Sequence, residues 1–236
     1  MTPEQFTEKL KAACGENLLA SVLYGSAAAG DAIPGKSGFN VMVVLKTCGL
    51  EDLKAVAAAS KDWLKKDNPP PLVFTREYLL SSADTFPIEL ADMKDYHKAL
   101  YGEDLLPGLA IDLAHLRLAL EREFKGQLVF LRHSYLQSGG GDKAVKNLLA
   151  NTVSPLLVLC RAALRLHGTA VPASKLDCAV ELAKHAQFDP SVFRAAHELR
   201  SGDYKGKEAP EALFGRYLAA IEQLCAAVDK WSAAGK

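Results

Sequence analysis

The segment from residue 25 to residue 40 holds the polar groups best placed to bind a ligand. It begins with Gly25-Ser26 and ends with Ser37-Gly38-Phe39-Asn40, and Asp31 is its only acidic residue. Mg²⁺ prefers hard, anionic oxygen ligands, usually one or two carboxylates besides phosphate and water. Serine hydroxyls and an asparagine carbonyl supply oxygen without charge, so we expect no metal ion to be bound by this segment.

Two apolar runs flank this segment and must position it. Leu18–Tyr24 and Phe39–Leu45 are apolar and β-branched, and each is bounded by Gly or polar turn residues, which is typical of buried strands. Further along, the pattern predicts a helix over Leu50–Lys66 and strands at Leu72–Phe74 and Pro87–Ala91. The N-terminal part of the chain is therefore predicted to form an α/β domain.

Two shorter helices complete this domain in the sequence pattern. Thr2 is suited to the N-cap of the first helix, with Pro3 at the first helical position and Gln5 completing a capping box, and Gly15 ends it. Residues 96–100 also have a helical pattern. We therefore expect one helix at the start of the domain and another near its end.

Beyond Gly102-Glu103-Asp104 the strand signals vanish, and Leu, Ala, Arg and Glu recur at helical spacing to the end of the chain. We place a hinge there, which predicts an N-terminal domain over 1–103, a helical bundle domain over 104–236, and an α+β fold class. The helices predicted for the bundle span 108–136, 143–167, 174–186, 190–200 and 209–232.

The segment after the first predicted strand resembles the nucleotidyltransferase superfamily. Gly25-Ser26 and Gly30-Asp31 match a family pattern in which a Gly-Ser pair begins a small-residue helix. In that family the backbone N–H groups and the serine hydroxyl hold a nucleoside triphosphate, using the partial positive charge of the helix start. The resemblance implies a nucleotidyltransferase-like domain with a mixed sheet, and a helical bundle like those of bacterial antibiotic nucleotidyltransferases. Tyr101-Gly102 resembles the end of the catalytic domain in bacterial members.

The chain departs from this family where metal is bound. The family continues with Ser-Asp-x-Asp, whereas Gly38 and Asn40 stand here in place of the two aspartates after Ser37. We therefore expect a catalytically inactive relative, possessing a nucleotide-binding or regulatory role, with a pocket formed by Gly25, Ser26, Ser37 and Asn40. We expect no cofactor for that form.

An active enzyme with a non-standard metal site is the first alternative. It would need Mg²⁺ and a nucleoside triphosphate. The family's third carboxylate lies on a later strand, and Glu89 is the best match for it, with Asp92 second. Asp31 in the loop could complete the metal site. Glu89 and Asp92 are catalytic candidates only if the protein transfers a nucleotide.

A ribonuclease or toxin–antitoxin partner is the second alternative. Arg161 and His167 fit the Arg-to-His spacing of the HEPN ribonucleases, and such a pair could polarise a phosphate and shuttle its proton. A histidine at a helix end, stabilising the helix dipole before Gly168, is the simpler interpretation. Nearby basic side chains could form either a second-substrate face or a solvated helix surface: Arg117, Arg122, Lys125, Arg132 and His133.

Composition narrows the choice of partners. The formal net charge is zero, which removes the broad attraction on which non-specific nucleic-acid binding relies, so we do not expect nucleic acid as a partner. The longest apolar stretch is too short and too interrupted for a membrane span, and the N-terminus lacks a secretory pattern, which favours a cytoplasmic protein. The five scattered cysteines predict buried thiols without disulfides or a zinc site. A nucleotide remains the expected ligand.

Overall fold

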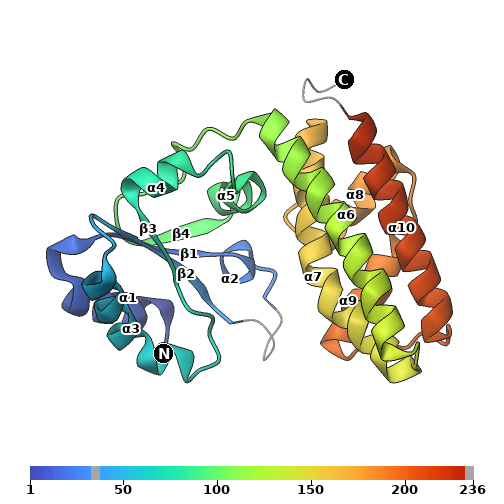
Figure 1. Cartoon of the computed structure of the whole chain (residues 1–236), viewed down its shortest axis with the longest axis horizontal. Coiled ribbons are helices and arrows are strands. Elements are labelled where there is room, and N and C mark those ends of the chain that lie inside the picture. The colour runs from blue at the N-terminus through green and yellow to red at the C-terminus, as the bar shows by residue number, and fades with distance from the viewer. Residues whose placement is uncertain (33–37, 232–236) are drawn as a thin grey trace. The chain divides into compact units, whose positions relative to one another are not determined.

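The structure is a computed structural model that describes residues 1–32 and 38–231 (Figure 1). The chain forms two compact units, Met1–Ile111 and Asp112–Lys236, and its fold is α+β, with the sheet in the first unit. The first unit runs past the predicted boundary at 103. Leu105, Leu106 and Leu109 belong to its hydrophobic core, so this stretch is packed structure where the sequence predicted a hinge.

A four-stranded mixed sheet forms the centre of the first unit. Its strands are β1 (Leu18–Tyr24), β2 (Asn40–Leu45), β3 (Leu72–Thr75) and β4 (His97–Gly102), in the spatial order β3-β2-β1-β4. β1 pairs antiparallel with both β2 and β4, and β2 pairs parallel with β3. The mixed sheet that the resemblance implied is therefore confirmed.

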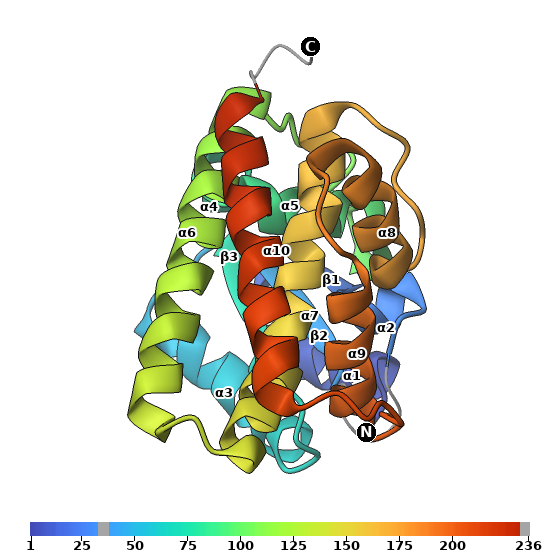
Figure 2. The same cartoon turned by 90° about the vertical axis from the view of Figure 1, so that its right-hand side faces the viewer.

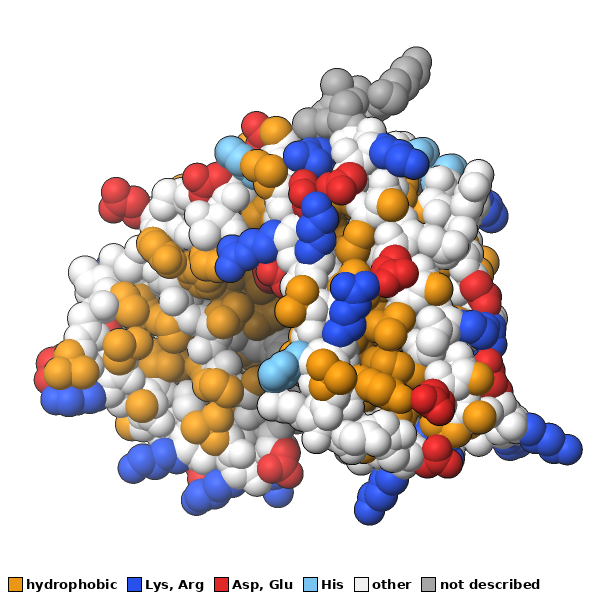
Figure 3. All heavy atoms as spheres, turned by 45° about the vertical axis from the view of Figure 1, so that its right-hand side comes forward, with side chains coloured by type: hydrophobic (Ala, Val, Ile, Leu, Met, Phe, Trp, Pro, Cys, Tyr) orange, Lys and Arg blue, Asp and Glu red, His pale blue; other side chains and the backbone are white. Residues whose placement is uncertain are grey.

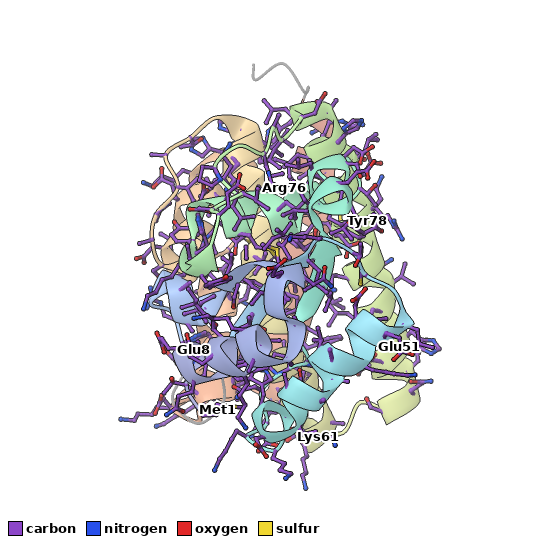
Figure 4. The ribbon with its side chains drawn as sticks, turned by 90° about the vertical axis from the view of Figure 1, so that its left-hand side faces the viewer. Met1, Glu8, Glu51, Lys61, Arg76 and Tyr78 are labelled. Atoms are coloured by element: carbon purple, nitrogen blue, oxygen red, sulfur yellow. The ribbon has the colours of Figure 1, made fainter. Side chains whose placement is uncertain are left out.

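One face of the sheet is covered by α1 (Pro3–Cys14) and α3 (Leu50–Leu64), which carry the labelled Glu8, Glu51 and Lys61 on their exposed surfaces (Figure 4). Because side chains alternate along a strand, β2 sends every second residue into this layer. The buried cluster comprises Phe6, Leu10, Leu18, Val41, Val43, Leu45, Val56, Ala59 and Trp63.

The opposite face is covered by α4 (Arg76–Ser81), α5 (Pro87–Asp95) and the segment after β4. The remaining residues of β2, Met42 and Val44, point into this second layer. Its buried cluster comprises Ala20, Val22, Met42, Val44, Leu79, Leu90, Met93, Leu105, Leu106 and Leu109. A strand covered on both faces is apolar throughout, which explains why β1 and β2 stood out in the sequence.

The first helix has the predicted cap. The Thr2 side chain accepts a hydrogen bond from the Gln5 backbone N–H at 3.3 Å, and the Gln5 side chain accepts one from the Thr2 backbone N–H at 2.9 Å. Pro3 begins the helix, and a short 3-10 helix, η1 (Gly15–Asn17), leads into β1. The structure thus confirms the capping box that the sequence pattern predicted.

Two predicted elements near the end of this unit are wrong. Pro87–Ala91, predicted as a strand, is the start of helix α5, in which Pro87 occupies the first turn, where a missing N–H costs nothing. Residues 96–100, predicted as a helix, lie in β4, because pairing with β1 overrides the helical preference of Ala and Leu.

The second unit is a bundle of helices arranged around α7. Its helices are α6 (Leu113–Ser138), α7 (Asp142–His167), α8 (Lys175–Ala186), α9 (Ser191–Ser201) and α10 (Pro210–Lys230) (Figure 2). α7 packs against all four of the others and supplies a long buried stripe. Each predicted helix is present, and α6 begins later than expected because Asp112 caps it.

By length and composition, α7 is the one helix among the described residues that could cross a membrane. However, 61% of its most apolar window is buried within the bundle. Packing in the core therefore accounts for its apolar composition.

The cysteines follow the prediction only in part. Cys160, Cys178 and Cys225 are buried in the bundle, whereas Cys14 is half-buried and Cys48 is exposed. Burial raises the pKa of the Cys160, Cys225 and Cys14 thiols, so these sulfurs stay protonated and unreactive.

Gly102 is the position in the first unit least able to accept a side chain. Its φ is +75°, and a Cβ atom there would lie 1.8 Å from the carbonyl oxygen of Leu19. We expect Gly102→Ala to lower the free energy of unfolding by roughly 3 kcal/mol, because strain and overlap add. Gly108→Ala is the matched control, since its Cβ meets nothing closer than 3.7 Å. Urea unfolding followed by Trp63 fluorescence measures both, and similar losses would contradict the explanation.

Candidate functional site

The Gly-Ser segment forms a tight strand-to-helix turn at the end of β1. Gly25 has φ +76°, the short helix α2 (Ser26–Ala29) follows, and Gly30 ends it in the left-handed conformation with φ +77°. The amides of Ala28 and Ala29 donate to the Gly25 carbonyl at 3.1 and 3.0 Å. The amides of Ser26 and Ala27, as at any helix start, have no carbonyl partner within the turn.

Asn40 lies directly beside this turn. It is opposite Tyr24 in the pairing of β1 with β2, at the point where the chain leaves β1 for Gly25. A Cβ atom on Gly25 would lie 2.8 Å from the side-chain nitrogen of Asn40. The structure thus brings Gly25, Ser26 and Asn40 together, and a neutral amide occupies the end of β2 next to the turn.

Gly38 is enclosed by a neighbouring loop. A Cβ atom there would lie 3.0 Å from the Pro69 ring and 3.2 Å from the Asp67 carbonyl oxygen. The loop is held in place because the Asn68 side chain accepts a hydrogen bond from the Phe39 amide at 2.9 Å and donates one to the Trp63 carbonyl at 3.3 Å. An aspartate cannot enter at position 38 unless this loop moves. The predicted pocket residue Ser37 lies outside the described residues.

The two carboxylates proposed for an active enzyme lie on a helix. Glu89 and Asp92 are in α5, not on a strand beside β2, so the strand-based reason for choosing them is wrong. Glu89 is exposed, whereas Asp92 is buried at 9% of its full exposure. Within the part of the chain that the structure describes, no three His, Cys, Asp or Glu side chains are grouped to hold a metal ion.

A second group of polar residues lies at the same end of the sheet. His97 faces Tyr24 across the β4–β1 pair, as Asn40 does across the β1–β2 pair, so all three occupy one row. His97 Nε2 lies 2.9 Å from the Asp104 carboxylate, which also accepts a hydrogen bond from the Leu106 amide at 3.3 Å. The imidazole therefore ties β4 to the segment that closes the core.

The contact with Asp104 uses only one nitrogen of the His97 ring. The other nitrogen, Nδ1, is buried with no hydrogen-bond partner among the described residues. The neighbouring phenol is neutral, since burial raises the pKa of Tyr24 to about 12. The row Asn40–Tyr24–His97 therefore contains no anionic metal ligand.

Sequence patterns did not identify this row. Tyr24 looked like the last residue of an apolar strand, and His97 lay in a stretch predicted to be helical. Only the pairing of β4 with β1 brings His97 level with the Gly25 turn. The sequence could have revealed the row only if the stretch from Tyr96 to Gly102 had been predicted as a strand.

The candidate ribonuclease pair in the second unit is not arranged as an active site. Arg161 is completely buried, and its guanidinium donates to the Ala173 carbonyl at 2.6 Å. His167 is the last residue of α7, and its Nδ1 lies 2.7 Å from the Thr169 hydroxyl. A buried guanidinium cannot reach an RNA phosphate, so the structure lends this hypothesis no support.

The basic side chains of α6 are largely neutralised by acids. Charges of both signs mix over the helical unit (Figure 3). The ion pairs of α6 are Arg117–Glu121, Lys125–Glu121, Lys125–Asp229 and Arg132–Glu222. This pattern fits the solvated helix surface and not a face for an anionic substrate.

The fold is nucleotidyltransferase-like. It combines a mixed sheet that has helices on both faces, a Gly-Ser turn at the end of β1 and a following helical bundle. Among solved structures, the chain is similar to a spectinomycin adenyltransferase from Enterococcus faecialis, crystallised with ATP and spectinomycin. The TM-score is 0.54 and the sequence identity 14%, and the match covers 92% of this chain and 97% of that one. No family model matches the chain, and no curated protein matches its sequence. The likeness therefore concerns the fold.

The enclosure of Gly38 can be tested by adding one methyl group. Gly38→Ala should lower the free energy of unfolding by about 1 kcal/mol, because the loop at Pro69 must shift by a few tenths of an ångström. Gly108→Ala is the matched control, since its Cβ would meet only the Leu105 carbonyl oxygen at an ordinary 3.7 Å. Urea unfolding measures the free energy of unfolding of both variants. Equal stability of the two would show that position 38 has room for a side chain.

The bond between His97 and Asp104 can be tested by an isosteric change. Asp104→Asn keeps the shape but removes the charge, and we expect a loss of about 1 kcal/mol, discounted for the partial exposure of the carboxylate. The Leu106 amide should exchange with solvent several times faster in hydrogen-exchange mass spectrometry or NMR. Asp84→Asn, on an exposed residue, is the control. An unchanged Leu106 amide would show that Asp104 does not hold this segment.

Proposed function

We propose that this chain is a nucleotidyltransferase-fold protein that binds a nucleotide without transferring it, and that it acts as a binding or regulatory module. The observation that carries the proposal is the start of β2. Asn40 stands beside the Gly25 turn where the resemblance places an aspartate, and a side chain at position 38 would require the loop at Pro69 to shift. Both positions that would supply anionic metal ligands are therefore without charge.

The chemistry of transfer makes this loss decisive. Nucleotidyl transfer depends on positioning and on metal ions that stabilise the attacking and leaving oxygens. Losing about 4 kcal/mol of that stabilisation slows a reaction roughly a thousandfold. One acid on α5 does not replace two carboxylates on β2, since a two-metal site needs ligands that reach both ions.

The same replacement favours nucleotide binding without a metal. A carboxylate beside the turn would repel a triphosphate unless a cation lay between them, because two like charges a few ångströms apart cost several kcal/mol at low dielectric. An amide at position 40 removes that repulsion. ATP is the natural first probe, since the similar adenyltransferase was crystallised with it.

Calorimetric titration of the full chain with ATP, with and without Mg²⁺, tests the proposal. We expect binding of similar affinity under both conditions, and no transfer of AMP to an acceptor. Binding that requires Mg²⁺, or metal-dependent transfer that is lost in Glu89→Ala, would overturn the proposal and establish an active enzyme. Failure to bind ATP, GTP, CTP or UTP would leave a scaffold without a nucleotide site.

Asn40→Asp should convert the binding from metal-independent to metal-dependent. The isosteric carboxylate should weaken ATP binding about tenfold in the absence of Mg²⁺, equivalent to about 1.4 kcal/mol, and Mg²⁺ should restore it. Asn147→Asp is the matched control, since it adds the same charge to an exposed position on α7. If both variants bind ATP like the natural protein, Asn40 does not line the nucleotide site.

A further inference from the structure

A pocket of about 390 Å³ lies in the second unit between the last turns of α8 and α10. Its lining residues come from these two helix ends and the residues that follow them: His185, Ala186, Gln187, Gln223, Ala226, Ala227, Lys230 and Trp231. None of these described lining residues is acidic. It belongs to neither the Gly25 turn nor the His97 row.

A cluster of three aromatic rings lies beside the pocket, and two of its members, His185 and Trp231, line it. The imidazoles of His167 and His185 lie with ring centroids 4.3 Å apart and planes tilted by 34°. The Trp231 ring meets His167 edge-on, at 5.0 Å and 63°. His167 is thus packed between a second imidazole and an indole, and Trp231 is the residue that ends α10.

The cluster brings together three helix C-termini. α7 ends at His167, α8 at Ala186 and α10 at Lys230. Helix C-termini carry partial negative charge and favour a nearby cation. A proton on each imidazole would nevertheless place two positive charges on stacked rings.

The surrounding acidic groups do not neutralise the positive charge of a second protonated imidazole. Glu181 has one carboxylate oxygen 3.9 Å from His185 Nε2, and its other oxygen binds Lys184 at 2.6 Å. The charged groups on the helix ends that form the cluster are Arg165, Glu181, Lys184, Asp229 and Lys230. Asp229 pairs with Lys125 of α6, and Arg200 of α9 donates to Ala150 in the first half of α7.

We propose that the His167–His185 pair is a pH-sensitive latch that holds Trp231 and the end of α10 in place, and releases them when both imidazoles are protonated. Neutral rings stack on one another and pack against the indole. Two imidazolium rings at 4.3 Å repel, and the repulsion is relieved when the rings separate. Because Trp231 forms a wall of the pocket, release would also change the pocket's shape.

The direction of the pH dependence follows from His167. Desolvation and, second, the nearby His185 lower the pKa of His167 below its ordinary 6.5. The unfolded chain therefore takes up this proton at a higher pH than the folded chain does. The stabilising effect of the cluster is complete above about pH 6.5 and is lost as the pH falls through the folded pKa.

Fluorine NMR of the full chain, labelled with fluorotryptophan, follows the latch directly. The protein has two tryptophans, and Trp231→Phe assigns their resonances. From about pH 8 to about pH 5 we expect the Trp231 resonance to move toward its solvent-exposed position, with a midpoint below about 6.5. The Trp63 resonance should stay fixed, because that ring is completely buried in the first unit and stacked on Phe6.

His167→Gln and His185→Gln should each abolish the Trp231 transition, because neither variant can hold two protons on the pair. His133→Gln is the matched control, since it removes an exposed histidine from α6 and should leave the transition unchanged. A Trp231 resonance that stays constant to about pH 5, or a transition that persists in both pair variants, would overturn the latch. Circular dichroism across the same range separates local release from loss of the bundle.

Discussion

The burial of β2 on both faces is the constraint on which the first unit depends. Val41, Val43 and Leu45 require one layer of helices, and Met42 and Val44 require another, so α1 and α3 must cover one side and α4 and α5 the other. No exposed edge of β2 remains either, since β1 and β3 pair with it. Side chains beyond the ends of β2 are not constrained by this burial and pairing. The candidate site lies at one of these ends.

At that strand end the fold is preserved while the charges expected for catalysis are not. The turn at Gly25 has a positive φ, which makes any other residue strained, and it approaches the Asn40 side chain closely. Around it lie an amide, a neutral phenol and an imidazole held by Asp104. The amide, the phenol and the imidazole are hydrogen-bonding groups and not anionic metal ligands.

The sequence predictions are accurate where an element is determined by residues close in the sequence, and wrong where it is determined by residues far apart in the sequence. β1 was predicted with its observed bounds and the capping box at Thr2 was found, because burial on both faces and local capping leave clear patterns. The stretches 87–91 and 96–100 were assigned the wrong type, since their structure is decided by packing against a sheet formed by distant residues. The partnership of His97 with Asp104 could not be predicted for the same reason.

The enclosure of Gly38 by Pro69 links two parts of the first unit that are distant in sequence. A side chain at position 38 would press on the Pro69 ring and on the Asp67 carbonyl oxygen, so the loop would have to shift by a few tenths of an ångström. Position 38 and the loop at residues 67–69 are therefore expected to vary together among related sequences.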